Sequence, residues 1–175
     1  RLSWIGRDML RNNPRVVRIR RQLVGNVVGS GIQPSVRWLG EDKEDPRRKT
    51  VERLIKRHCL RTEFDADGMK TMLGQHGQAF GTIVGDGEVL LRRRYRRPAD
   101  GYALNFQVQA LEADFLNTDI DGPLPNGNYA VMGIEFNMLG RRVAYHLFKD
   151  HPGGRYGAMP ATTRVDARNV IHAFD

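Results

Sequence analysis

The feature that most constrains the fold is a change in the spacing of apolar residues at residue 85. Before this point, apolar residues recur every three to four positions, which is typical of helices with one buried face. After it, apolar and polar residues alternate, which is typical of strands with one buried face. Because helices precede strands, we expect an α+β fold with N-terminal amphipathic helices followed by antiparallel β-hairpins.

The length and composition of the chain suit one folded domain. It has 175 residues, of which 40% are hydrophobic and 27% are charged, close to the average of globular proteins. We therefore expect residues 1–175 to form a single domain, with residues 1–84 mainly helical and residues 85–175 mainly β. The apolar runs are too short to span a membrane, so no membrane partner is expected.

The first helix is marked by its cap. Asn13 and Pro14 predict its start, because asparagine caps helices and proline suits their first turn. Glycines at 29 and 31 predict its end. An apolar stripe runs along it, formed by Val16, Ile19, Leu23 and Val27 and widened by Val24 and Val28. A short strand broken by a proline is expected at Ile32–Trp38.

Two further helices are expected before the spacing changes. Residues 40–49 are polar and predict a solvated loop, and Asp45-Pro46 predicts the start of the second helix. Asp67-Gly68 predicts the start of the third. Glycines 74, 77 and 81 weaken this third helix but permit close packing against a neighbour. A turn is expected at Gly85–Gly87.

The β part is expected to contain two hairpins and a final strand. Alternation predicts strands at Glu88–Tyr95 and Leu104–Leu111, paired antiparallel. A second hairpin is predicted from Gly133–Phe136 and Arg142–Phe148. Residues 170–174 predict a last strand, which we expect to lack its partner in this chain.

The charge of the chain is high and uneven. It has 28 basic and 20 acidic residues, and the basic ones are 23 arginines and 5 lysines. Residues 1–21 hold seven arginines and one aspartate, and residues 92–97 hold five arginines. Arginine suits interfaces, carboxylates and phosphates because its planar guanidinium binds in a bidentate manner. The pattern predicts an acidic partner, either nucleic acid or an acidic protein surface.

These two patches supply the candidate binding residues. In a strand, Arg92 and Arg94 point to one face of the sheet, whereas Arg93 and Tyr95 point to the other. Such a run can follow phosphates with Tyr95 stacked on a base, or protect an edge strand from aggregation by its charge. The candidate subunit-interface or DNA-facing residues are Arg11, Arg15, Arg18, Arg92, Arg93, Arg94, Arg96 and Arg97. In the interface interpretation, acids such as Asp119 and Asp121 are possible partners.

The common nucleotide-binding motifs and nucleophile motifs are absent from the sequence. No GxxxxGK[ST] loop, GxGxxG fingerprint or GxSxG elbow is present. His58 and Cys59 are adjacent, so on a helix they point about 100° apart and cannot act as base and nucleophile.

Three groups of acids are candidate cation sites. Residues 63–74 resemble a calcium loop, but its twelfth position is Gly74 instead of a bidentate glutamate. Acids at the positive end of a helix dipole explain this segment better. Asp86 with Glu88, or Glu112 with Asp114, would share a face if extended, as in a two-metal nuclease. Turn chemistry explains Asp86 better, so we expect no enzyme activity, no cofactor and no metal.

Five segments resemble the lambda-type phage portal protein family, in the family's order. They are RDMLRNNPRVVRIRRQLVGNVVGSGIQP (7–34), GEVLLRR (87–93), LEADFLNT (111–118), GIEFNMLGRRVAYHLFKDHPG (133–153) and RVDARNVIHAF (164–174). Three features depart from the family pattern. His58 stands where an aromatic residue is usual, the RRRYRR run is more basic, and the PGQ-type segment that should follow is absent.

The resemblance implies a structural protein. Portal proteins form a ring, usually of twelve subunits, at one vertex of the capsid, and double-stranded DNA passes through it. The large subunit of the terminase docks on the ring, as do capsid, scaffold and head-tail completion proteins. The resemblance therefore implies location in the virion, with assembly in the host cytoplasm. It also implies that the chain is a wing-like fragment without the stem, clip and crown regions.

Two alternatives stay open at this point. The first is a basic nucleic-acid-binding module unrelated to portals, carried by the two arginine patches. The second is a metal-dependent nuclease that uses Asp86 and Glu88.

Overall fold

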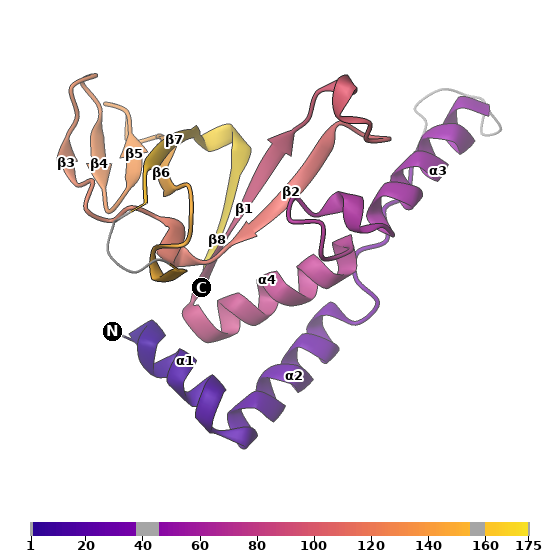
Figure 1. The fold of residues 1–175 in the computed structure, drawn as a ribbon, viewed down its shortest axis with the longest axis horizontal. Coiled ribbons are helices and arrows are strands. Elements are labelled where there is room, and N and C mark those ends of the chain that lie inside the picture. Colours follow the sequence, from indigo (N-terminus) through magenta and orange to yellow (C-terminus); the bar gives the residue numbers. More distant parts are fainter. Residues whose placement is uncertain (1, 38–45, 155–159, 175) are drawn as a thin grey trace.

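The computed structural model describes residues 2–37, 46–154 and 160–174. Helices come first and antiparallel strands follow, so the expected α+β fold is confirmed (Figure 1). The four α-helices are α1 (Leu2–Asn12), α2 (Pro14–Val28), α3 (Pro46–Cys59) and α4 (Met72–Asp86). Short 3-10 helices occur at Thr62–Phe64, Pro98–Asp100, Ala113–Phe115, Pro152–Gly154 and Ala167–Asn169. No described helix is both long enough and apolar enough to cross a membrane.

The strands form two sheets in which every pair is antiparallel. The first sheet has the order β2-β1-β8, with β1 (Glu88–Tyr95), β2 (Phe106–Leu111) and β8 (Val170–Phe174). The second has the order β3-β4-β5-β6-β7, with β3 (Gly122–Pro123), β4 (Tyr129–Val131), β5 (Ile134–Phe136), β6 (Arg142–Phe148) and β7 (Thr162–Asp166). Both predicted hairpins are therefore present, as β1–β2 and β5–β6.

One apolar core joins the two sheets. Its buried members are Leu90, Leu111, Leu116, Tyr145, Leu147, Val165 and Val170, which come from strands of both sheets and from the connection after β2. Leu90 and Leu147 are fully buried. The alternation in the sequence points to these positions because every second residue of a strand faces the same side.

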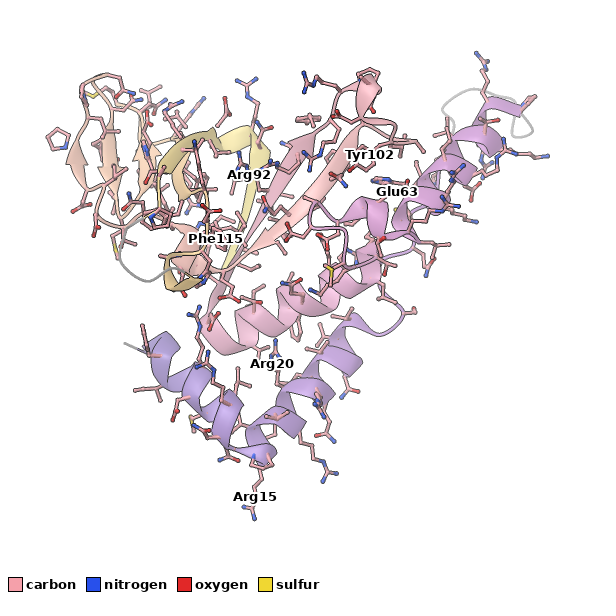
Figure 2. All side chains as sticks on the ribbon, in the orientation of Figure 1. Arg15, Arg20, Glu63, Arg92, Tyr102 and Phe115 are labelled. Carbon is pink, nitrogen blue, oxygen red and sulfur yellow. The ribbon has the colours of Figure 1, made fainter. Side chains whose placement is uncertain are left out.

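The helices pack on one another through glycines. The Nε of Arg20 in α2 donates to the carbonyl of Gly81 in α4, and a Cβ at Gly81 would lie 2.5 Å from the Arg20 guanidinium. A Cβ at Gly6 of α1 would lie 2.5 Å from the carbonyl oxygen of Gly85. Close packing is thus confirmed for Gly81, and Figure 2 shows Arg20 between α2 and α4.

The break between α1 and α2 follows from its sequence. Asn13 adopts an extended conformation, and its side chain accepts a hydrogen bond from the backbone N–H of Arg15. Pro14 occupies the first turn of α2, where its missing N–H is not needed. The predicted cap is confirmed, and it sets α1 and α2 at an angle (Figure 1).

A buried polar joint attaches α4 to β2. Asp65 accepts hydrogen bonds from the backbone N–H groups of Asp67, Met69 and Lys70 and from the side chain of Gln75. Gln75 also donates to the carbonyl of Val108 in β2. Asp65 therefore satisfies N–H groups of the turn that precedes α4, whereas the preferred interpretation placed these acids at the start of the helix itself.

Four predictions about helix and strand boundaries were wrong. Residues 31–37 form no strand, because Pro34 cannot donate to a ladder and no neighbouring strand pairs with them. Trp38 and most of the predicted loop at 40–49 lie outside the described residues, and the remaining residues 46–49 already belong to α3. The third helix starts at Met72 instead of Asp67, because Thr71 is its cap. It also continues into the expected turn and ends at Asp86, with Gly87 as its C-cap at a φ of 88°.

One prediction about strand pairing was also wrong. β8 has a partner, since it pairs with β1 from Glu88–Phe174 to Arg92–Val170. β1 therefore lies between β2 and β8 over residues 88–92, whereas Arg93, Arg94 and Tyr95 pair with β2 alone and remain at an edge of the sheet, as one interpretation of the arginine run expects. The pairing is difficult to predict from the sequence because residues 96–169 lie between the two strands.

Candidate functional site

A cluster of charged side chains lies where α1 meets the end of α4 and the connection after β2. Arg7 of α1 is at its centre. Its Nε donates to Oδ1 of Asp86 over 2.8 Å, and a terminal nitrogen donates to Oδ2 over 2.9 Å, which is the bidentate geometry of strong pairs. Its other terminal nitrogen donates to Asp114. A carboxylate oxygen of Glu112 lies 3.6 Å from the terminal nitrogen that is bound to Asp86. The bonds to Asp86 contribute most to raising the pKa of Arg7, so the cation is permanent.

His151 lies on the other side of the same acids. Its Nε2 is 3.5 Å from Glu112 and 3.6 Å from Asp114, and its ring meets the edge of Phe115. Its Nδ1 accepts a hydrogen bond from the backbone N–H of Gly153. The neutral ring therefore carries its proton on Nε2, which faces the two carboxylates.

Among the described residues, Glu112, Asp114 and His151 could offer a cation three ligand atoms within 4.8 Å of one another. The two carboxylates already face donors from the protein. Arg7 donates to Asp114, and Nε2 of His151 faces both Glu112 and Asp114. A metal ion would have to displace both, so the geometry fits an ion-pair joint that fastens α1 better than a metal centre.

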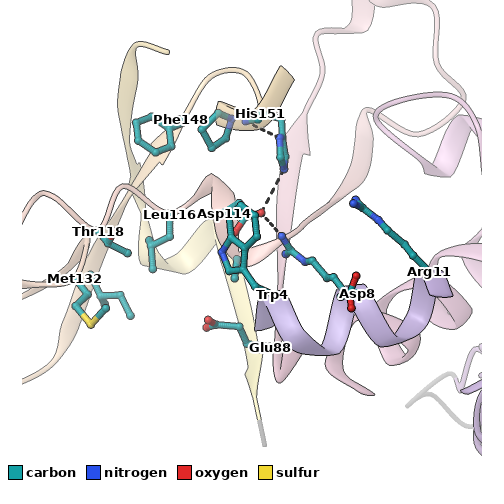
Figure 3. Close-up of a pocket in the computed structure, with 15 residues that line it drawn as sticks. Trp4, Asp8, Arg11, Glu88, Asp114, Leu116, Thr118, Met132, Phe148 and His151 are labelled. Carbon is teal, nitrogen blue, oxygen red and sulfur yellow. Dashed lines mark hydrogen bonds and ion pairs between the residues drawn. The ribbon is translucent and has the colours of Figure 1, made fainter. Parts of the chain in front are cut away.

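A groove of about 860 Å³ runs beside this cluster (Figure 3). The α1 side contributes Trp4, Arg7, Asp8 and Arg11. The facing wall is largely apolar and includes Leu116, Met132, Ile134 and Phe148, with Thr118 at its margin. A groove with one charged wall and one apolar wall can bind an amphipathic segment of another chain.

The carboxylates considered for a nuclease are not a pair. Asp86 ends α4 and is bound to Arg7, whereas Glu88 begins β1 and forms a 2.7 Å contact with Nε2 of His172. The contact with His172 is the main cause that lowers the pKa of Glu88. The two acids could share a face only if residues 86–88 were extended, and this condition is not met because α4 includes Asp86. Each acid is held by a separate protein partner.

The arginine run on β1 is largely folded onto its own sheet. Arg94 donates to Oε1 of Gln109, and Arg96 donates to Oε1 of Gln107. Burial, together with the nearby charge of Arg94, lowers the pKa of Arg92. Arg93 is half-buried, and Arg97 is exposed. Tyr95 is also exposed, so this strand keeps only part of the surface that a phosphate track would need.

The arginines of the first two helices are more accessible. Arg11, Arg15 and Arg18 are all exposed, and Arg11 lines the groove. Figure 2 shows Arg15 at the corner between α1 and α2, far from Arg92 on the sheet. The two basic patches therefore do not form one continuous surface. Their role at an interface or on DNA stays a prediction.

His58 and Cys59 lie in different surroundings and do not form a catalytic pair. The ring of His58 is buried against Phe64 and Phe106, so it packs as an aromatic residue would. Burial lowers the pKa of His58 and raises the pKa of the Cys59 thiol. A neutral imidazole beside a protonated thiol fits a packing role for both residues.

The sequence interpretation did not single out Arg7. Its partners lie 79 and 107 positions away, so no local pattern connects them. The only available signal was the RD pair that opens the first segment of the family resemblance.

The comparisons with known proteins agree with this resemblance. The model of the family described as phage portal protein, lambda family, matches residues 6–175. A relative named probable portal protein, from Halomonas phage phiHAP-1, is 29% identical over 174 residues, which is 97% of this chain. The chain belongs to the lambda family of phage portal proteins. It spans 33% of the length of the relative.

Proposed function

We propose that the chain is the wing-like part of a structural portal subunit at one vertex of a phage capsid. The observation that carries this proposal is the family match over residues 6–175, which covers nearly the whole chain. In the full-length protein, subunits form a ring, twelve in number, that double-stranded DNA crosses during packaging and ejection. The ring assembles in the host cytoplasm and remains in the virion.

The partners of this ring follow from the same proposal. The terminase large subunit docks on it during packaging and supplies the nucleotide chemistry, and head-tail completion proteins follow. Capsid or scaffold proteins contact its outside. Within the chain, Asp86, Glu88, Glu112 and Asp114 are engaged by Arg7, His151 and His172, which supports a structural role over a catalytic one.

The arrangement of the exposed surfaces supports ring assembly. Closed rings use heterologous contacts, in which one patch of a subunit meets a different patch of its neighbour. The helices present exposed arginines and apolar side chains. In contrast, residues 112–140 contain five acids and no lysine or arginine.

A nucleic-acid-binding module is the weaker proposal. Exposed Tyr95 beside the arginine run favours it, because an aromatic ring can stack on a base. The separation of the two basic patches and the bonds of Arg94 and Arg96 to glutamines count against it. DNA binding by the chain that weakens steeply with salt would favour this alternative.

Negative-stain electron microscopy of the full-length protein tests the main proposal. We expect rings with a central hole wide enough for duplex DNA. Monomers or small dimers at several salt and protein concentrations would overturn it.

A further inference from the structure

Helix α2 has two apolar rows, of which only one is used within the chain. Val17, Val24 and Val28 are half-buried on the side of α4, and Val24 lies close to Gly77. The other row is Ile19, Leu23 and Val27, at intervals of four residues, and its members are 55%, 40% and 61% exposed. Arg15 continues this row at the same interval, and exposed Arg18 borders it. An apolar row that the fold does not bury is available to a partner.

The turn between β4 and β5 presents a second unusual feature. Met132 has a φ of 47°, in the left-handed region that large side chains seldom adopt, and Gly133 follows with a φ of 85°. Asparagine or glycine suits the first of these positions better. The Met132 side chain is nevertheless 59% exposed, so the strained backbone presents an apolar group to solvent. Residues with strained backbone conformations are often found at sites that bind a ligand or a partner.

The surroundings of Met132 are acidic and open. Asp121 accepts a hydrogen bond from the backbone N–H of Met132 through Oδ1, and both Asp119 and Asp121 are exposed. The other acids of residues 112–140 are engaged, because Glu112 and Asp114 face Arg7 and His151 and Glu135 is buried against Arg164.

The same turn forms one side of the groove mouth. Trp4 on α1 is 76% exposed and lines the opposite side, and the apolar wall lies between them (Figure 3). An amphipathic helix that carries arginines at one end of its apolar row matches the apolar wall in hydrophobicity and the exposed acids Asp119 and Asp121 beside the turn in charge. The exposed row of α2 has this composition.

We propose that α2 of a second copy of the chain docks in the groove between Trp4 and Met132. The row Ile19, Leu23 and Val27 covers the apolar wall, and Arg15 and Arg18 face Asp119 and Asp121. Helix α2 and the strands β4 and β5 that flank the Met132 turn lie on different parts of the molecule (Figure 1). Each copy therefore offers both halves of a heterologous contact that can repeat around a ring. This inference rests on the proposed function and names the surfaces through which the ring forms.

Charge exchange in the full-length protein tests the pairing. Arg15→Glu with Arg18→Glu places four acids together, and Asp119→Lys with Asp121→Lys places four bases together. We expect each double variant to lower the fraction of ring at least tenfold by mass photometry and negative stain. The variant that combines all four changes should recover to within about threefold of wild type, because the charges are complementary again. As a matched control, Lys56→Glu with Arg57→Glu on exposed α3 should leave ring formation unchanged.

A second variant separates assembly from folding. Met132→Asn keeps a residue that tolerates the left-handed turn, so its thermal midpoint should equal or exceed that of wild type. Its ring fraction should nevertheless fall several-fold, because the apolar contact is lost. A role limited to folding would leave the ring fraction unchanged.

The outcomes distinguish the two proposals. If both double variants form rings to the same extent as wild type, the proposed docking surfaces are wrong and the portal proposal is unaffected. Absence of self-association in wild type would overturn both proposals. If the arginine variant loses salt-dependent binding to duplex DNA and the combined variant does not recover its rings, Arg15 and Arg18 serve nucleic acid instead of a second copy.

Discussion

The helical part and the β part of this molecule are stabilised in different ways. In the described residues, the buried apolar side chains all lie between Val89 and Val170, within the β part. The buried side chains of the helical part are polar, namely His58, Asp65 and Gln75. The helices are held by half-buried apolar side chains, glycine contacts, one arginine cluster and hydrogen bonds, while other apolar residues of α1 and α2 stay exposed. The fully buried apolar core thus lies in the β part, and the exposed apolar side chains of the helices are available to contact other chains.

The largest effect is expected from the core of the β part. Leu147→Ala removes a fully buried side chain from the cluster that joins the two sheets. We expect the free energy of unfolding to fall by about 3–5 kcal/mol, since the cavity cannot collapse completely. Urea denaturation monitored by circular dichroism measures this loss. A loss below about 1 kcal/mol would contradict a core centred on the β part.

A smaller and local effect is expected at Arg7. Arg7→Met leaves Asp86 and Asp114 without their cation, which we expect to cost about 2–3 kcal/mol at this partly exposed site. The loss should appear as faster hydrogen exchange in α1 with unchanged exchange in β6. Arg11→Met is the matched control on the same helix. Equal acceleration in both parts would show that the helices are not attached independently.

A comparable effect that depends on pH is expected at Glu135. This fully buried carboxylate accepts hydrogen bonds from Arg164, Asn126 and Asn128, and chiefly the bond from Arg164 lowers its pKa from 4.5 to about 2. Because the pKa is lower in the folded state, the stabilisation is complete above about pH 4.5 and is lost as the pH falls toward 2.

The variant Glu135→Gln isolates this contribution. The free energy of unfolding of this variant should be about 2 kcal/mol lower at neutral pH, since Arg164 then donates to a neutral amide instead of a carboxylate. Its stability should also vary less than that of wild type between pH 4.5 and 2. Parallel pH profiles for the two proteins would contradict the assignment.

The smallest effect on folding is expected in the exposed row of α2. Leu23→Ala should change the free energy of unfolding of the monomeric chain by less than about 0.5 kcal/mol, because exposed substitutions seldom matter more. Chemical denaturation measures it, with Leu147→Ala as the reference. A loss of more than about 2 kcal/mol would show that the row contributes to a core within one chain.

The sequence predicted the strands better than the helix ends and the contacts of the cluster. Alternation and turn residues are local, so β1, β2, β5 and β6 were recognised with their neighbours. The start of α4 was misplaced because Asp67-Gly68 looks like a start signal, whereas Thr71 accepts the capping bond. Apolar spacing on α2 was visible, but spacing alone does not distinguish a row that packs inside the chain from one that stays exposed.

The contacts of Arg7 could not be predicted from the sequence for another reason. Asp86 and Asp114 become its neighbours only when α1, α4 and the connection after β2 are already assembled. Pairing between β1 and β8 was missed in the same way. Contacts between distant segments depend on the whole topology, so they cannot be predicted from local sequence patterns.

The long sequence separation between Arg7 and Asp114 also affects the order in which segments can dock during synthesis on the ribosome. Helix α1 is synthesised first, but its anchor Asp114 follows 107 residues later. At typical rates of about 5–20 residues per second, α1 waits roughly 5–20 seconds before it can dock. During this interval the apolar residues of α1 and α2 are accessible to chaperones and to other nascent chains. Helix α1 therefore docks through Arg7 well after its own synthesis, only once the segments as far as Asp114 have emerged.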